Sequence, residues 1–152
     1  MTVSLSDWLR NGWLHEHRTS REEIRDLLDV VERDLADSLT AGLSADWRLN
    51  IAYNAALQAA TAALAAAGYR ASRDGHHFRV IQSLAYTVGA RPEVVTRFDQ
   101  FRKKRNVGGY EQAGLVSNQE ASEMHDLALE LRDSVVRWLK ATHPELVSEV
   151  RA

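Results

Sequence analysis

The stretch SADWRLNIAYNAALQAATAALAAAG, residues 44–68, decides how this chain folds. Ser44 is a typical N-cap and Gly68 a typical stop, so the stretch predicts a helix that reaches about Ala67. The helix is apolar on nearly every side, and most of its apolar residues are alanines. A helix without a polar face is buried against several neighbours, and alanines let their backbones approach closely. We therefore expect this helix at the centre of the protein.

Two polar residues, Asn54 and Gln58, interrupt the apolar stripe that Trp47 and Ile51 begin on this helix. They lie four residues apart and so share one face. The simpler interpretation is a hydrogen-bonded pair inside a helix interface, and a functional role is the alternative.

Four other helices are expected around the central one. Capping boxes, Ser20-x-x-Glu23 and Ser117-x-x-Glu120, open the first and the last of them. The first is expected to end at Gly42, and the last at His143-Pro144. Between them, one helix follows His76-His77 and ends at Gly89, and the next begins at Pro92. The buried stripes predicted for these helices are Ile24, Leu27, Leu28, Val31, Leu35 and Leu39; Phe78, Ile81, Leu84, Ala85 and Val88; Val94, Phe98 and Phe101; and Met124, Leu127, Ala128, Leu131, Val135, Trp138 and Leu139.

The predicted fold class is all-α, an up-and-down bundle of about five helices in one domain over residues 1–152. No stretch shows the sustained alternation of a strand, and residues 69–75 are expected to be a polar connection. Residues 1–18 are expected to form a lid that packs Trp8 and Trp13 on the body, and residues 145–152 a frayed tail. We interpret His15-Glu16-His17 as a solvated loop, because alternate positions on a helix cannot share a metal ion.

Composition limits the possible functions. The formal net charge is −2, so any nucleic-acid site must be a local patch. The chain has no cysteine, which excludes disulfides and thiolate zinc sites, and no histidine follows a glutamate by three positions, which disfavours a di-iron bundle. We predict no metal and no cofactor. The N-terminus lacks the apolar run of a signal peptide, and the weakly polar residues 55–67 are too few to span a membrane, so a cytoplasmic protein is expected.

A second stretch, FDQFRKKRNVGGYEQ at residues 98–112, carries the candidate chemistry. The apolar stripe of its helix leads to Arg105, so this guanidinium should turn toward the buried face. Asn106 follows directly, Gly108-Gly109 break the helix, and Tyr110 comes one turn later. An inward arginine, an amide and a phenol at a helix end can bind a phosphate.

The neighbouring cations allow two interpretations. Arg102, Lys103 and Lys104 fit a solvated last turn that complements the helix dipole, or they assist in substrate binding. His76 and His77 are either exposed residues at a helix start or further phosphate contacts. Arg105 itself can serve a structural ion pair instead of a ligand.

Over most of its length the chain resembles the HEPN family (higher eukaryote and prokaryote nucleotide-binding domains). The resemblance rests on AYNAALQAATAALAAAGYR, on GHHFRVIQSL and most specifically on Arg105-Asn106-x-x-x-Tyr110. It implies a helical bundle, usually a dimer, whose active members are metal-independent ribonucleases and often toxins. Arg105 matches the motif arginine and Asn106 the polar residue after it, whereas Tyr110 stands where the family usually has histidine.

The resemblance implies an endoribonuclease in which a ribose 2′-OH attacks its own phosphate. Arg105 would stabilise the phosphorane, Asn106 would orient the phosphate, and Tyr110 would act as an acid or a positioner. A phenol with its ordinary pKa of about 10 is a poor base at pH 7. A non-catalytic module that binds RNA, nucleotide or a partner protein is therefore the alternative, and a helical scaffold a third. A nucleotidyltransferase antitoxin is a further partner that the resemblance implies.

Overall fold

The structure is a computed structural model that describes residues 4–108 and 115–147, and for residues 106–108 only the backbone. Its described part is all-α apart from two short strands, which confirms the predicted fold class. The helices are α1 (Leu5–Arg10), α2 (Arg21–Asp37), α3 (Ala45–Ala66), α4 (His76–Ser83), α5 (Pro92–Gly108), α6 (Asn118–Thr142) and α7 (Pro144–Val147), and the strands are β1 (Leu14–Glu16) and β2 (Tyr69–Ala71).

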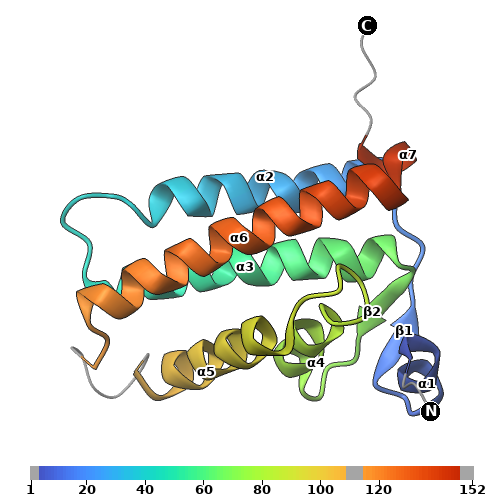
Figure 1. Cartoon of the computed structure of the whole chain (residues 1–152), viewed down its shortest axis with the longest axis horizontal. Coiled ribbons are helices and arrows are strands. Elements are labelled where there is room, and N and C mark those ends of the chain that lie inside the picture. Colours follow the sequence, from blue (N-terminus) through green and yellow to red (C-terminus); the bar gives the residue numbers. More distant parts are fainter. Residues whose placement is uncertain (1–3, 109–114, 148–152) are drawn as a thin grey trace, which may run out of the picture.

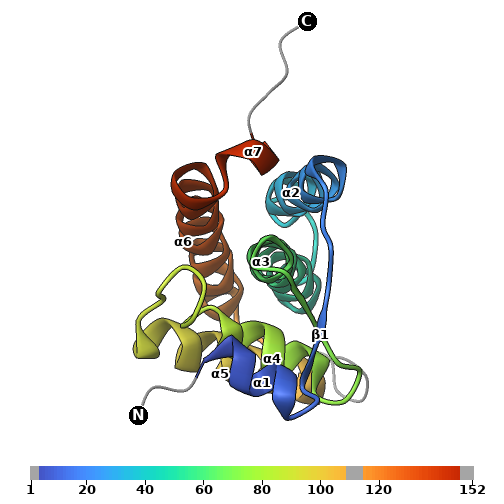
Figure 2. The same cartoon turned by 90° about the vertical axis from the view of Figure 1, so that its right-hand side faces the viewer.

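Helix α3 is the central element, as predicted. It runs beside α2 and α6, while α4 and α5 cover its opposite side (Figures 1 and 2). Almost all of its alanines are buried, so the helix is enclosed on several sides. Ser44 caps its start by accepting a hydrogen bond from the Trp47 N–H, and Gly68 follows its end with φ of 99°, a conformation that glycine adopts without strain.

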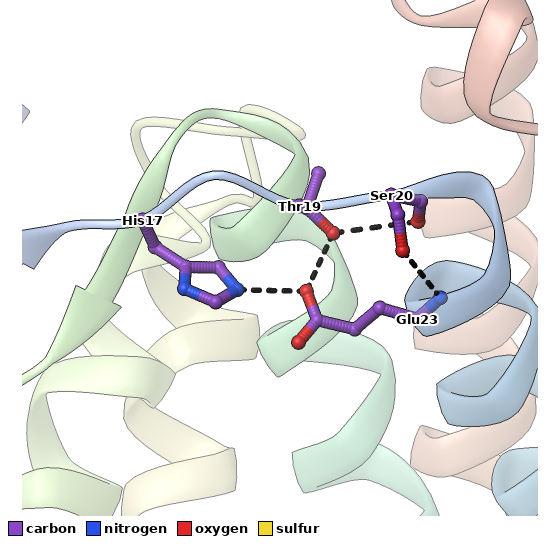
Figure 3. A network of polar contacts seen from close by, with 4 residues as sticks. All are labelled: His17, Thr19, Ser20 and Glu23. Carbon is purple, nitrogen blue, oxygen red and sulfur yellow. Dashed lines mark hydrogen bonds and ion pairs between the residues drawn. The ribbon is translucent and has the colours of Figure 1, made fainter.

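The predicted N-caps are confirmed at the starts of α2 and α6. Ser117 and Glu120 form both halves of a capping box. At α2, Ser20 accepts a hydrogen bond from the Glu23 N–H, but the Glu23 carboxylate does not complete the box (Figure 3). It instead accepts hydrogen bonds from Thr19 and from His17 Nε2, the latter at 2.7 Å. This carboxylate therefore joins the segment after β1 to the first turn of α2.

The expectation of a strand-free chain was wrong at one place. β1 and β2 pair antiparallel, with Leu14 opposite Ala71 and Glu16 opposite Tyr69, so neither the predicted loop at His15-Glu16 nor the polar connection at residues 69–71 is irregular. A hydrogen bond from the His17 N–H to the Gly68 carbonyl extends the pairing. Each strand has only three residues, too few to show alternation, and the partner lies more than fifty residues away.

Two helices end earlier than their glycines suggested. α2 ends at Asp37, well before Gly42, and α4 ends at Ser83, well before Gly89. A buried serine lies at each end, and its hydroxyl donates to the carbonyl oxygen three residues earlier: Ser38 to Leu35 and Ser83 to Val80. Such side-chain bonds compete with continuation of the helix. As a result, Leu39 and Ala85 are exposed and not buried as expected.

The first and the last helix of the described part, α1 and α7, pack against the body. Trp8 of α1 is buried, as the lid interpretation predicted, and its ring lies edge-on to those of Trp13 and Tyr86. The expected tail begins with the single turn of α7, whose Leu146 and Val147 pack on the core. No helix in the described part of the chain is long and apolar enough to cross a membrane.

Candidate anion-binding site

Arg105 turns toward the buried side of α5, as its position on the stripe predicted. Phe98 and Phe101 on the same face are buried, and the Arg105 guanidinium carbon lies 5.1 Å from the centre of the Tyr53 ring on α3. The Tyr53 ring is itself packed edge-on against Phe98 at 5.5 Å. A cation thus lies over an aromatic floor that the core holds in place.

The Arg105 guanidinium is not satisfied by the described part of the protein. Its Nε atom is buried and has no hydrogen-bond partner among the residues that the structure describes. Leaving a buried donor unpaired costs about 1–3 kcal/mol, and more when the group is charged. The structural ion pair that was the alternative role for Arg105 is not found among the described residues, where the ion pairs of α5 are made by other residues. An anionic ligand would supply the missing acceptor.

His77, at the start of α4, joins Arg105 through Tyr53. The Tyr53 hydroxyl lies 3.2 Å from His77 Nδ1. Burial raises the pKa of Tyr53 to about 12, so this hydroxyl keeps its proton at neutral pH. The hydroxyl donates to Nδ1 in the tautomer that carries the imidazole proton on Nε2, and it accepts from Nδ1–H in the other tautomer.

The charge of His77 is set by its surroundings. Burial lowers the pKa of His77, and the nearby cations Arg105 and Arg102 and the adjacent His76 lower it further. The imidazole is therefore neutral at pH 7. It offers an N–H donor beside Arg105 without adding a charge.

The three cations before Arg105 lie in different surroundings. Arg102 Nε donates to Asp99 Oδ1 at 2.7 Å, and the Arg102 side chain is mostly buried. Lys103 is exposed and lies 3.7 Å from the other oxygen of Asp99. Lys104 lies 3.4 Å from Glu120 of α6. Arg102 is therefore the cation that the structure groups with the site, whereas the ammonium of Lys104 is directed to α6.

The remaining predicted site residues are distributed as follows. The rings of His76 and His77 lie 6.0 Å apart, and of the two it is His77 that contacts Tyr53. Asn106 belongs to α5, but its side chain lies outside the described part, and Tyr110 lies outside the described residues altogether. Asn54 and Gln58 are bonded to each other, and Asn54 also donates to the Asp34 carboxylate at 2.7 Å, as expected of a structural pair.

Two residues of the site were missed by the sequence analysis. Tyr53 was assigned only to the apolar surface of the central helix, and Asp99 was not singled out. For Asp99 a signal existed, because it precedes Arg102 and Lys103 by three and four positions, the spacing of helical ion pairs. For Tyr53 the only indication in the sequence was its polar hydroxyl within the alanine-rich central helix.

No group of three or more histidine, aspartate or glutamate side chains is placed to hold a metal ion within residues 4–105 and 115–147. Comparison of the chain with protein-family models, with curated proteins and with solved structures gives no match.

Proposed function

We propose that this protein is an HEPN-like, metal-independent endoribonuclease that binds the scissile phosphate of RNA at Arg105. The observation that carries the proposal is the buried, unpartnered Nε of Arg105 above the Tyr53 ring. A guanidinium held in this way has its donors ready for phosphate oxygens before the ligand arrives.

In the proposed reaction the ribose 2′-OH loses its proton to water as its oxygen attacks the phosphorus, and the bond to the 5′-oxygen breaks. The products are a 2′,3′-cyclic phosphate and a 5′-hydroxyl that receives a proton. Arg105 neutralises the charge that grows on the phosphorane, and the Nε2–H of His77 donates to another of its oxygens. Asn106 orients the phosphate, and Tyr110 positions the leaving oxygen or protonates it.

The second candidate is a module that binds RNA or a nucleotide without cleaving it. The hydrogen bond between Tyr53 and His77 favours this candidate in the tautomer in which Tyr53 donates to Nδ1, because His77 then has a donor at Nε2 and no free lone pair to serve as a base. Both candidates use the same phosphate site, so they differ in turnover and not in binding.

The proposed partners also rest on the resemblance to the HEPN family. We expect a homodimer that brings two Arg105 sites together, a cytoplasmic location, and a nucleotidyltransferase antitoxin if the protein is a toxin. An adjacent nucleotidyltransferase gene would support the toxin proposal.

The test is cleavage and binding of single-stranded and structured RNA by the purified protein in EDTA. We expect cleavage to continue without free metal and to leave a 2′,3′-cyclic phosphate. Arg105→Ala should reduce cleavage at least about 100-fold, the usual effect of removing one donor to a transition-state oxyanion. Arg97→Ala is the matched control, because Arg97 is an exposed arginine of the same helix that pairs with Glu123.

Two substitutions at Tyr110 separate the candidates. Loss of cleavage with retained binding in Tyr110→Phe would show that the hydroxyl takes part in the chemistry, and Tyr110→His should raise the rate. Binding without cleavage by the wild type and by Tyr110→His would favour the second candidate. If neither binds any RNA while Arg105→Ala unfolds, Arg105 is structural and the scaffold alternative stands.

A further inference from the structure

Arg79, on α4, is held among aromatic rings. Its guanidinium carbon lies 3.8 Å from the centre of the Trp13 ring, 5.4 Å from that of Phe78 and 5.8 Å from that of Trp8. The shortest of these distances is that of a guanidinium stacked on a ring face. Arg79, Trp13 and Phe78 are all only partly buried, so ligands can reach them.

Stacking occupies the faces of a guanidinium and leaves the N–H groups at its edge available. The Arg79 guanidinium makes no hydrogen bond or ion pair with any residue that the structure describes, in contrast to those of Arg102, Arg97 and Arg132, each of which pairs with a carboxylate. Trp8 of α1 and the following Trp13 contact Arg79 through their rings and form no hydrogen bond with its N–H groups. Its charge and its hydrogen-bond donors therefore remain available for a ligand.

Phe78 connects Arg79 to the site around Arg105. The guanidinium of Arg102 lies 5.6 Å from the centre of the same Phe78 ring that Arg79 contacts. Arg102 in turn lowers the pKa of His77, which reflects its closeness to the imidazole. Cations and rings thus alternate from Trp13 through Arg79, Phe78 and Arg102 toward the Arg105 site.

From this arrangement we infer a second RNA subsite, in which Arg79 binds a backbone phosphate near the scissile one and Phe78 provides a stacking surface for an unpaired base. Alternating arginines and aromatic rings suit single-stranded RNA, because bases must be unpaired to stack on side chains. The inference rests on the proposed function, and it specifies the RNA substrate as single-stranded and longer than a dinucleotide.

The experiment measures binding of uridine oligonucleotides of two and of ten nucleotides by fluorescence anisotropy, at several salt concentrations. Wild type should bind the longer oligonucleotide more tightly. Arg79→Gln should lose about tenfold of its affinity for the ten-mer, the effect of one charged hydrogen-bonded contact, and keep its affinity for the dinucleotide. The slope of log affinity against log salt should fall by about 0.7, the value for one phosphate contact on a single strand. Arg25→Gln, on the exposed face of α2, is the control.

Arg79→Gln could weaken binding by disturbing the packing of α1 and not by removing a phosphate contact, and two further variants distinguish these effects. Arg79→Lys keeps the charge without the stacking and should keep the salt slope while losing affinity. Phe78→Leu keeps Arg79 and should reduce the gain in affinity from the dinucleotide to the ten-mer. Circular dichroism shows whether each variant is folded.

The outcomes separate the two proposals. If the wild type binds no RNA, the proposed function fails and the subsite fails with it. If the wild type binds RNA and Arg105→Ala weakens binding, while folded Arg79→Gln and Phe78→Leu keep the full length dependence and salt slope, only the subsite is overturned. Equal competition by duplex RNA of the same length would also overturn it.

Discussion

At the scale of single residues, Tyr53 is the side chain on which the site is built. It belongs to α3, its ring lies beneath Arg105 of α5, and its hydroxyl bonds His77 of α4. One buried phenol therefore contacts a cation and a histidine from two different helices.

His77 should make stability depend on pH between about 5 and 7. Its pKa in the folded protein lies below the ordinary value of about 6.5, so the unfolded chain binds the proton first as the pH falls. The stability that neutral His77 contributes is complete above pH 6.5 and is lost as the pH falls toward the folded pKa. His77→Gln cannot titrate and should lose less stability than the wild type between pH 7 and pH 5 in urea unfolding.

His15→Gln is the control for this measurement, because His15 is exposed on β1. Equal losses for His77→Gln and the wild type would mean that the imidazole is not held neutral in the folded state.

At the scale of elements, the features that depend on neighbouring residues were predictable, and the contacts between distant segments were not. Ser20, Ser44 and Ser117 act within their own first turns, so their caps could be read from the sequence. The inward turn of Arg105 follows from helical periodicity and was likewise predictable. The pairing of β1 with β2 and the contact of Tyr53 with His77 depend on how distant segments meet, and no local pattern encodes them.

Glu23 should stabilise the junction between β1 and α2. Although burial raises the pKa of its carboxyl, hydrogen bonds with Thr19 and His17 and the charges of His17 and Arg70 hold that pKa below the ordinary value (Figure 3). Glu23→Ala should lower the free energy of unfolding by about 0.5–1 kcal/mol at pH 7, as expected for a partly exposed pair. The measurement is chemical unfolding with Glu22→Ala as the control, since Glu22 lies in the same first turn and is exposed.

The effect of Glu23 should also have a characteristic pH dependence. A depressed carboxyl pKa contributes stability above the unfolded pKa of about 4.5 and loses it as the pH falls through the folded pKa. The difference between Glu23→Ala and the wild type should therefore shrink below about pH 4.5. A difference that stays constant into acid would mean that the carboxylate charge contributes nothing at this junction.

At the scale of the whole molecule, the most exposed large apolar side chains gather at one end. Leu39 follows α2 and is 67% exposed, and Trp47, which was expected to face the core, is 63% exposed in the first turn of α3. A hydrogen bond from Arg48 to Asn118 places the start of α3 beside the start of α6, at the end where α5 finishes (Figure 1). Exposed apolar side chains of this size are typical of a surface that binds another protein chain.

We expect the protein to sediment at micromolar concentration as a dimer of 17.1 kDa chains, with Trp47 in the interface. Trp47→Ser should shift the sedimentation equilibrium toward monomer by at least about tenfold, since burial of one large side chain contributes about 1.5–3 kcal/mol. Tyr86→Ser is the control, because Tyr86 is an exposed aromatic residue packed on Trp8 at the N-terminal segment. A clean monomer for the wild type would reject the dimer.

The enclosure of α3 has a consequence for hydrogen exchange. Amides of a helix covered on several sides exchange only when the whole domain opens, whereas peripheral elements exchange through smaller local openings. Tyr53 lies in α3, and Arg105 and His77 lie on peripheral helices that pack on it. A bound anion that bridges Arg105 and His77 should therefore slow exchange in α5 and α4 where their local openings release it, and in α3 as well, because opening of the whole domain also breaks the site. Isotope labelling would thus report ligand binding even without catalytic turnover.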